Sequence, residues 1–224
     1  PRVRSDLAFV TASIGRREQG APLKLILASA SPRRAEILRN AGIQFEVRAT
    51  DVDESRLAGE LPGDYVRRLA LAKARSAAAD YRDTGQEALI LGADTVVVVD
   101  ADVLGKPVSQ DDARSMLRRL SGRVHEVHTG LALLRSSGAE QRVVEEITRV
   151  HFAPLTDRET EDYIATGEPF DKAGAYGIQG IGGRYVTRIE GCYFNVMGLP
   201  LARLWSLLRE LGWENSVGAQ RAAK

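Results

Sequence analysis

The chain has 224 residues, enough for one large domain or two small lobes that bury a hydrophobic core. Hydrophobic residues make up 44% and charged residues 27%, values typical of a globular protein. The 31 lysines and arginines balance 30 acidic residues, so we expect neither nucleic acid nor an anionic membrane as a partner. The single cysteine, Cys192, excludes an internal disulfide and a cysteine-based zinc site, and we expect it to be buried as a small apolar side chain.

The two ends of the chain differ from the part between them. Residues 1–22 carry charges throughout and contain no apolar h-region, so a secretory signal is not expected. No apolar run approaches the roughly 18 residues that span a membrane, and we expect a cytoplasmic protein. We interpret 1–22 as a flexible N-terminal extension, 23–213 as the folded domain and 214–224 as a C-terminal tail.

Hydrophobic periodicity, helix caps and glycine stops predict strands that alternate with helices. In chain order we expect a strand at 23–28, a helix from Pro32 to about Gly42, a strand at 45–49, a helix from Pro62 to about Tyr81, a strand at 89–99, a helix at 111–121, a hairpin of strands at 124–135 and 141–153, a short helix between Thr156 and Gly167, and a final helix at 201–211. This order predicts an α/β or α+β fold in which helices flank a mixed central sheet.

The first candidate site is the segment SASPRR at 29–34, which follows the first strand. Ser31 and Pro32 predict a helix start, where free N–H groups and the helix dipole favour an anion. The guanidinium groups of Arg33 and Arg34 suit phosphate oxygens, and an anionic ligand would offset the conflict between their charge and that dipole. The alternative is a capped helix with two solvated arginines.

Carboxylates mark two further candidate sites. Asp94, followed by Thr95, interrupts an otherwise aliphatic strand, where a buried carboxylate needs a partner, a proton or a metal. Such carboxylates often act as catalytic bases, although Asp94 could instead cap a neighbouring turn. Three carboxylates at 51–54, ending with Glu54, can bind a hard cation such as Mg²⁺ or form a solvated acidic loop.

Lysines and a glycine-rich segment complete the candidate residues. Lys73 lies within a predicted helix and Lys106 in a Gly-Lys-Pro turn, where a lysine can reach a phosphate or stay solvated. The segment DKAGAYGIQG at 171–180 contains Asp171, Lys172 and Gln179, whose amide can read the edge of a base. Six glycines between 174 and 191 indicate a loop that is either mobile or shaped by something that it binds.

The three histidines predict no metal site. His125 and His128 lie three residues apart on a predicted strand and therefore face opposite sides of it. With no cysteine nearby, zinc is not expected, and we interpret both of them and His151 as structural. The chain also contains neither a P-loop nor a dinucleotide-binding fingerprint.

Taken together, these segments resemble the Maf family of nucleoside triphosphate pyrophosphatases. The resemblance rests on LILASASPRR, GADTVVVVD, GKP and DKAGAYGIQG, which occur in this order between about Leu23 and Leu211. It implies a two-lobed fold with a mixed sheet and a deep cleft, assembled as a homodimer. It also implies hydrolysis of a nucleoside triphosphate to the monophosphate and pyrophosphate with a divalent cation, Mg²⁺ or Mn²⁺.

The resemblance also implies roles for single residues. Asp94 matches the proton acceptor of the family, and the other polar residues match positions in its cleft. We therefore predict phosphate contacts from Ser29, Arg33, Arg34, Lys73, Lys106 and Lys172, and a metal site formed by Glu54, Asp94 and Asp171.

Three residues are similar to the dTTP/UTP pyrophosphatase branch of the family. Arg33 in SPRR, Thr95 in GADT and Gln179 in YGIQG are predicted to set the preference for the base. The other branch, which prefers a 7-methylated guanine nucleotide, typically has Trp in place of the first arginine and lacks YGIQG. The extension of about 22 residues departs from typical members.

Three other functions stay open at this point. They are a nucleotide-binding regulator of cell division without turnover, an enzyme for altered purine triphosphates, and an aspartyl-phosphate phosphatase that uses Asp51.

Overall fold

The computed structural model describes residues 23–81 and 86–215. The expected extension at 1–22 lies outside these residues, as do 82–85 and most of the expected tail, 216–224. Within the described ranges, no helix has the length and apolar character that crossing a membrane requires.

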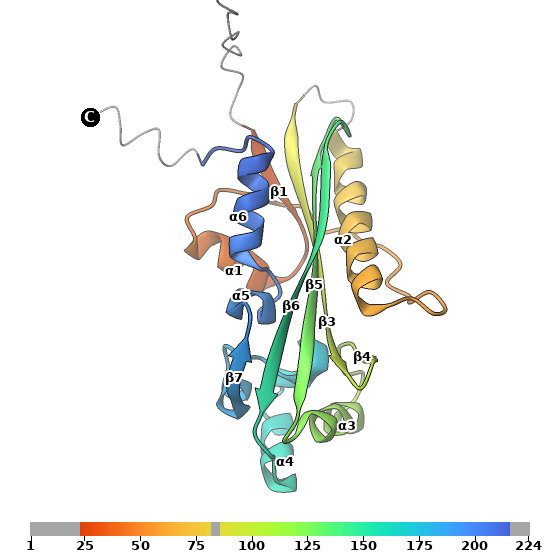
Figure 1. Cartoon of the computed structure of the whole chain (residues 1–224), viewed down its shortest axis with the longest axis vertical. Coiled ribbons are helices and arrows are strands. Elements are labelled where there is room, and N and C mark those ends of the chain that lie inside the picture. Colours follow the sequence, from red (N-terminus) through yellow and green to blue (C-terminus); the bar gives the residue numbers. More distant parts are fainter. Residues whose placement is uncertain (1–22, 82–85, 216–224) are drawn as a thin grey trace, which may run out of the picture.

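A mixed β-sheet forms the centre of the molecule (Figure 1). The described residues contribute seven strands to it: β1 (Lys24–Ala28), β2 (Glu46–Val47), β3 (Ala88–Val99), β4 (Asp102–Leu104), β5 (Val124–Arg135), β6 (Gln141–Phe152) and β7 (Val186–Glu190). Six of them follow the order β2-β1-β3-β5-β6-β7, and β4 pairs with the end of β3. β1 is parallel to β2 and β3, whereas the other pairs are antiparallel. The mixed sheet expected from the sequence is confirmed.

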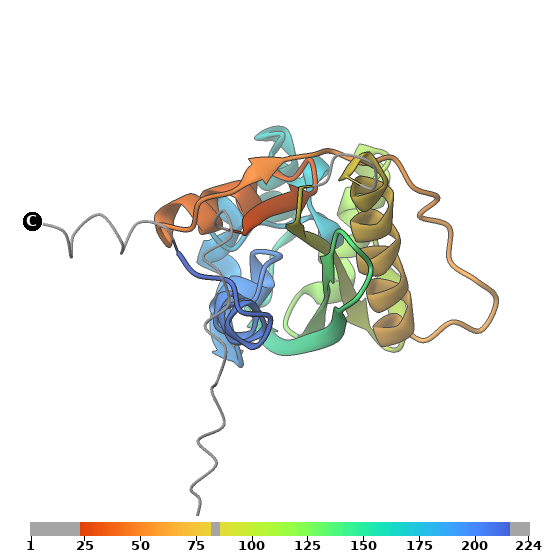
Figure 2. The ribbon, with the colours of Figure 1, turned by 90° about the horizontal axis from the view of Figure 1, so that it is seen from above.

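Helices cover both faces of this sheet (Figure 2). The α-helices are α1 (Pro32–Asn40), α2 (Pro62–Ala78), α3 (Gln110–Leu120), α4 (Asp157–Ala165), α5 (Tyr193–Val196) and α6 (Leu201–Glu210). Short 3₁₀ helices are η1 (Ala79–Tyr81), η2 (Glu168–Asp171), η3 (Ala173–Ala175) and η4 (Ile181–Tyr185). α2 lies on one side of the sheet and α6 on the other, while α3 and α4 lie at the end remote from α1 (Figure 1).

Local capping explains where several helices begin. A capping box starts α4, because Thr156 accepts from the Glu159 N–H and the Glu159 carboxylate accepts from the Thr156 N–H. Ser109 caps α3 by accepting from an N–H of the first turn. Ser31 stands at the N-cap of α1 as expected, but its hydroxyl makes no cap bond, so Pro32 is the local signal for that start.

Two hydrophobic cores lie along one face of the sheet and form the two lobes. Alternate β3 residues divide between them, with Leu89 and Leu91 packed against α1 and α6, and Val97 and Val99 packed against α3 and α4. Thr95 lies between the two groups on the same face. The opposite face packs against the alanine-rich side of α2.

The edge of β3 is left without a neighbouring strand between the two lobes. β1 ends at Ala28, opposite Gly92, and β4 pairs with β3 only from Val97 onward. Among the described strands, none pairs with this edge at Asp94 and Thr95, while the other edge pairs with β5. Because successive residues of a strand face opposite sides, this short stretch presents a carboxylate to one side and a hydroxyl to the other.

Four details differ from the sequence-based expectations. The strand expected at 45–49 is reduced to β2, which is exposed at the edge of the sheet. β4 and β7 were not predicted, because they are short and are defined by pairing rather than by alternation. The short helix α5 was also missed, and Cys192 just before it is half-buried rather than buried.

Candidate active site

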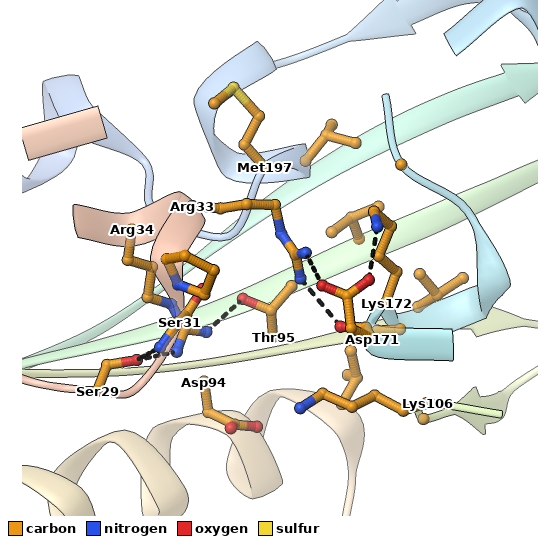
Figure 3. A pocket seen from close by; sticks show the side chains of 18 of the residues that line it. Ser29, Ser31, Arg33, Arg34, Asp94, Thr95, Lys106, Asp171, Lys172 and Met197 are labelled. Carbon is orange, nitrogen blue, oxygen red and sulfur yellow. Dashed lines mark hydrogen bonds and ion pairs between the residues drawn. The ribbon is translucent and has the colours of Figure 1, made fainter. Parts of the chain in front are cut away.

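A cleft of about 660 Å³ opens at the unpaired edge of β3 (Figure 3). It is lined by every residue predicted for the site: Ser29, Arg33, Arg34, Glu54, Lys73, Asp94, Thr95, Lys106, Asp171, Lys172 and Gln179. These residues come from the β1–α1 loop, α1, the loop before α2, α2, β3, the turn after β4 and the segment at 171–180. The fold thus gathers segments that lie far apart in the chain, while the chemical role of each residue stays a prediction.

Asp94 lies in the cleft on the side that faces α2, and it is only 8% exposed. Lys73, which is 9% exposed, places Nζ 2.6 Å from Asp94 Oδ1 and 2.6 Å from Glu54 Oε1. The Lys73 ammonium offsets the cost of removing the Asp94 carboxylate from water, while Glu54 stays largely exposed. The second oxygen of Asp94, Oδ2, accepts no hydrogen bond from the described residues and is available to a ligand.

Lys73 reaches Asp94 because α2 packs very close to the sheet. A Cβ atom built on Gly92 would lie 2.0 Å from the Ala70 carbonyl oxygen, so a larger residue does not fit there. A Cβ atom on Gly130 of β5 would lie 2.2 Å from the Val66 carbonyl oxygen. The absence of a side chain at these two positions lets the helix backbone approach the strands.

Arg34 is buried and holds the two sides of the site together. Its Nε donates to the Gly198 carbonyl at 2.8 Å, Nη1 to Ser29 Oγ at 3.0 Å and Nη2 to Thr95 Oγ1 at 3.1 Å. Burial lowers the pKa of Arg34, and the charge of Asp94 opposes this shift. Arg34 uses three N–H groups inside the described part of the protein and so orients Ser29 and Thr95, while its contact with phosphate stays a prediction.

Arg33 connects α1 to η2 across the cleft (Figure 3). Its Nη1 lies 2.6 Å from Asp171 Oδ2, and its Nη2 donates to the Asp171 carbonyl at 3.1 Å. Lys172 Nζ lies 2.5 Å from Asp171 Oδ1. Burial alone would raise the pKa of Asp171, but hydrogen bonds from Lys172 and Arg33 hold it below its usual range. One carboxylate therefore neutralises two cations that are predicted to bind phosphate.

The side chains of Lys106 and Gln179 are exposed at the cleft. Within the described part of the chain, neither side chain makes a hydrogen bond, and Lys106 forms no ion pair. An ammonium and an amide with free hydrogen-bonding groups can contact a bound molecule without breaking internal bonds. Their positions fit the predicted phosphate and base contacts.

The family model described as "Maf-like protein" matches residues 24–211. The chain belongs to the Maf family. A Maf relative from Koribacter versatilis, named dTTP/UTP pyrophosphatase, is 53% identical over 189 residues, which cover 84% of this chain and 94% of the relative. Proteins with the same name from Symbiobacterium thermophilum and Clostridioides difficile are 50% and 47% identical. Their matches cover 85% and 84% of this chain, and 95% of each relative.

A solved structure of a nucleoside-triphosphatase / dITP/XTP pyrophosphatase from Mycobacterium abscessus also matches this Maf chain. It covers 84% of this chain and 98% of that one, at 17% identity and a TM-score of 0.36.

The metal site predicted at Glu54, Asp94 and Asp171 stays a prediction, and in this structure Asp171 is not grouped with the other two carboxylates. Among the described residues, no three His, Cys, Asp or Glu side chains gather into a group that could hold a metal ion. Asp171 binds Arg33 and Lys172 instead of joining the other two carboxylates. Glu54 and Asp94 do lie close together, because both carboxylates form an ion pair with the Lys73 ammonium. Because Mg²⁺ is often held by one or two carboxylates plus substrate phosphates, these two residues fit a divalent cation.

Several residues that line the Maf cleft were not predicted, among them Tyr65 and Glu168, and Tyr176 was given no role of its own within the glycine-rich segment. The Tyr65 hydroxyl donates to the Glu54 carbonyl at 2.7 Å and so fixes the acidic loop. Burial and the charges of Asp94 and Glu54 raise the pKa of Tyr65. Its position eight residues before Lys73, about two turns along the same helix face, is a signal that could have identified it.

Tyr176 belongs to a buried aromatic cluster beneath the glycine-rich segment. Its ring packs in a T-shaped arrangement against His125 and Phe152, and its hydroxyl shares a 2.8 Å hydrogen bond with His125 Nε2. Burial lowers the pKa of His125 to about 4 and raises that of Tyr176. The histidine is therefore neutral in the folded protein at neutral pH.

His125 is expected to make the Maf domain less stable as the pH falls from 7 to 5. The unfolded chain protonates this imidazole near its ordinary pKa of 6.5, whereas the buried ring resists protonation down to about 4. The unfolded state then binds more protons in this window, so this group alone lowers the free energy of unfolding by about 2 kcal/mol at pH 5. Urea unfolding at both pH values measures it. His125→Phe should lose this component, and an unchanged pH slope in that variant would contradict the assignment.

Proposed function

We propose that this Maf protein hydrolyses dTTP and UTP to the nucleoside monophosphate and pyrophosphate, with 23–213 as the catalytic unit. The observation that carries the proposal is the placement of Asp94 beside a cationic cleft. Its carboxylate is held in the cleft by Lys73, while Arg33, Lys106 and Lys172 line the same cavity. The names of relatives at about 50% identity support the same reaction and the same nucleotides.

In the proposed reaction, water attacks the α-phosphorus and the bond to the oxygen bridging the α and β phosphorus atoms breaks. Asp94 Oδ2 accepts the proton of the water, because Oδ1 stays bound to the Lys73 ammonium. General-base assistance of this kind is worth about 10² to 10⁴ in rate. Pyrophosphate leaves with the electron pair of the broken bond and is stabilised by the cations of the cleft.

The basic residues supply the remaining electrostatic stabilisation. Lys106 has no partner among the described residues and contacts phosphate directly. Arg33 and Lys172 contact phosphate by exchanging the Asp171 carboxylate for phosphate oxygens. A divalent cation, Mg²⁺ or Mn²⁺, held beside Asp94 by the Glu54 carboxylate and by phosphate oxygens of the nucleotide, would neutralise phosphate charge and polarise the bond that breaks. Holding these groups around the triphosphate before reaction removes much of the entropic barrier.

Gln179 is expected to set the preference for thymine and uracil. Its free amide fits the O4 and N3–H edge of these bases, and a base without that pattern would leave the amide unpaired. Thr95 contributes to the base preference indirectly. Its hydroxyl is already hydrogen-bonded to Arg34 and Thr129, so it orients these side chains and does not contact the base itself. In Gln179→Ala, the ratio of kcat/KM for dTTP over dCTP should fall by about tenfold. An unchanged ratio would remove Gln179 from base recognition.

A pyrophosphate-release assay over common and modified nucleoside triphosphates tests the proposal. It is run with Mg²⁺, with Mn²⁺ and with EDTA. We expect metal-dependent release from dTTP and UTP. Nucleotide binding without release would favour the regulator without turnover, and preference for ITP or XTP would favour an enzyme for altered purine nucleotides. Phosphate trapped on Asp51 would indicate an aspartyl-phosphate phosphatase.

We also propose that the protein is a cytoplasmic homodimer, as the family resemblance and the sequence suggest. Sedimentation equilibrium measures the oligomeric state, and cell fractionation measures the location. A monomer at micromolar concentration, or recovery with the membrane fraction, would contradict these two proposals.

A further inference from the structure

Two side chains, Glu168 and Tyr163, hold the backbone of the glycine-rich segment by hydrogen bonds. The Glu168 carboxylate accepts from the Tyr163 hydroxyl at 2.8 Å, from the Ile181 N–H at 2.8 Å and from the Gly182 N–H at 3.1 Å. The Tyr163 hydroxyl in turn accepts from the Gly177 N–H at 3.1 Å. The backbone from 177 to 182 is therefore tied at both ends to one carboxylate–phenol pair, with Gln179 at its centre.

The backbone lies so close to this pair that a side chain at these glycines would displace Glu168, Tyr163 or Lys172. A Cβ atom on Gly180 would be 2.3 Å from Glu168 Oε2, and one on Gly182 would be 2.5 Å from the Tyr163 hydroxyl. A Cβ atom on Gly177 would be 3.2 Å from Glu168 Oε1 and 2.5 Å from Lys172 Cε. The glycines at 177, 180 and 182 do not have φ in the left-handed region. What matters at these positions is therefore the close approach of the backbone to neighbouring side chains, and not an unusual backbone conformation.

Burial and hydrogen bonds hold the Glu168–Tyr163 pair in place, and the Glu168 carboxylate is ionised. Tyr163 is fully buried in α4 and packs in a T-shaped arrangement against Tyr185. Burial alone would raise the pKa of Glu168, but hydrogen bonds from the Gly182 N–H, the Tyr163 hydroxyl and the Ile181 N–H outweigh it, so this pKa is lowered. Hydrogen bonds to an ionised carboxylate are stronger than bonds between neutral groups. The Glu168 carbonyl also accepts from Lys172 Nζ at 2.7 Å, which links the pair to a predicted phosphate contact.

We infer that Glu168, supported by Tyr163, is a positioning residue for base selection, because it fixes the 177–182 loop so that Gln179 meets the base. This inference rests on the proposed function. It assigns the choice between nucleotides to the lobe that contains α3 and α4, in residues other than the predicted phosphate contacts. It further implies that loss of the pair changes selectivity more than the rate of the chemical step.

The experiment compares the full chain with Glu168→Gln and Tyr163→Phe. Glutamine replaces a charged acceptor by an amide whose NH₂ opposes backbone N–H groups, and phenylalanine removes only the hydroxyl while keeping the buried ring. Glu159→Gln is the matched control, because Glu159 lies in α4 with Tyr163, its carboxylate accepts from the Thr156 backbone N–H, and it makes no hydrogen bond to residues 177–182 in the described part of the chain. Three quantities are measured: hydrogen exchange of the amides at 177, 181 and 182, kcat and KM, and the dTTP over dCTP ratio of kcat/KM.

We expect amide exchange at these three positions to rise at least about tenfold in both variants, with no change in Glu159→Gln. KM for dTTP should rise and the dTTP over dCTP ratio should fall by about tenfold, while kcat changes far less. Adding Gln179→Ala to either variant should cause little further loss of selectivity, because each change removes the same interaction, the contact of Gln179 with the base. An unchanged selectivity ratio, or exchange rates equal to those of the wild type, would overturn the inference.

Failure of this inference can be told apart from failure of the proposed function. If the unaltered protein releases no pyrophosphate from any nucleotide, the proposed function fails. Amide exchange and equilibrium binding of dTTP and dCTP then still test whether Glu168 fixes the loop. A variant that binds both nucleotides as selectively as the wild type would overturn the inference without any measurement of turnover.

Discussion

Asp94→Asn is expected to bind dTTP with nearly unchanged affinity and to lose about 10² to 10⁴ in kcat. Asparagine has the shape of aspartate but cannot take a proton from the attacking water. The fold should persist, because Lys73 keeps Glu54 as a charged partner and the asparagine oxygen can still accept from Nζ. Pyrophosphate release gives the rate, and calorimetric titration with dTTP in the presence of Ca²⁺ gives the affinity.

Asp102→Asn serves as the control for this substitution. Asp102 is an exposed carboxylate of β4 that pairs with Arg119 and does not line the cleft. Loss of an exposed ion pair costs little stability, so both kcat and affinity should match the wild type. A turnover number in Asp94→Asn within a few-fold of this control would remove Asp94 as the base. Loss of binding together with turnover would instead give Asp94 a role in holding the nucleotide.

Gly92→Ala is expected to lower stability more than any ordinary glycine replacement in this protein. The added methyl group would be placed 2.0 Å from the Ala70 carbonyl oxygen and 2.9 Å from the Ala74 nitrogen. Both contacts are with backbone, so α2 must shift away from β3 as a whole. Overpacking of this kind costs about 3 kcal/mol, which corresponds to a decrease in Tm of roughly 6 to 12 °C.

The same substitution should impair the site, because moving α2 withdraws Lys73 from Asp94. We therefore expect residual activity to fall even at temperatures where the variant is folded. Gly105→Ala is the matched control for stability, since a Cβ atom there would meet nothing within 4 Å. Thermal unfolding followed by circular dichroism measures both variants. Equal Tm values would show that α2 accommodates the methyl group and that its close approach is not needed.

Much of the fold followed from interactions between residues that are close in the chain. The capping box at Thr156 and Glu159 and the proline at the start of α1 set helix starts locally. The aliphatic run of β3 marked the central strand, and Asp94 was conspicuous because a carboxylate is costly in such a run. These signals need no knowledge of the rest of the molecule, which is why the sequence predicted them.

The partners of the charged residues could not be predicted in the same way. Asp171 was expected beside Glu54 and Asp94, yet it pairs with Arg33, which lies 138 positions away in the chain. The sequence motifs contain three carboxylates, and oxygen ligands of this kind favour a metal site on chemical grounds alone. Which cation each carboxylate meets depends on the order of the strands and on how the two lobes close, and these are long-range properties.

The sequence by itself determined that a carboxylate, a phosphate-binding helix start and a glycine-rich loop exist in this chain. Only the tertiary structure decided that they meet, because β1 and β4 leave the edge of β3 free at Asp94. It also decided what shapes the loop: Glu168 and Tyr163 are unremarkable in the sequence, but the folded backbone wraps around them. Local propensity and hydrophobic periodicity act over a few residues, whereas these contacts arise only when distant segments pack together.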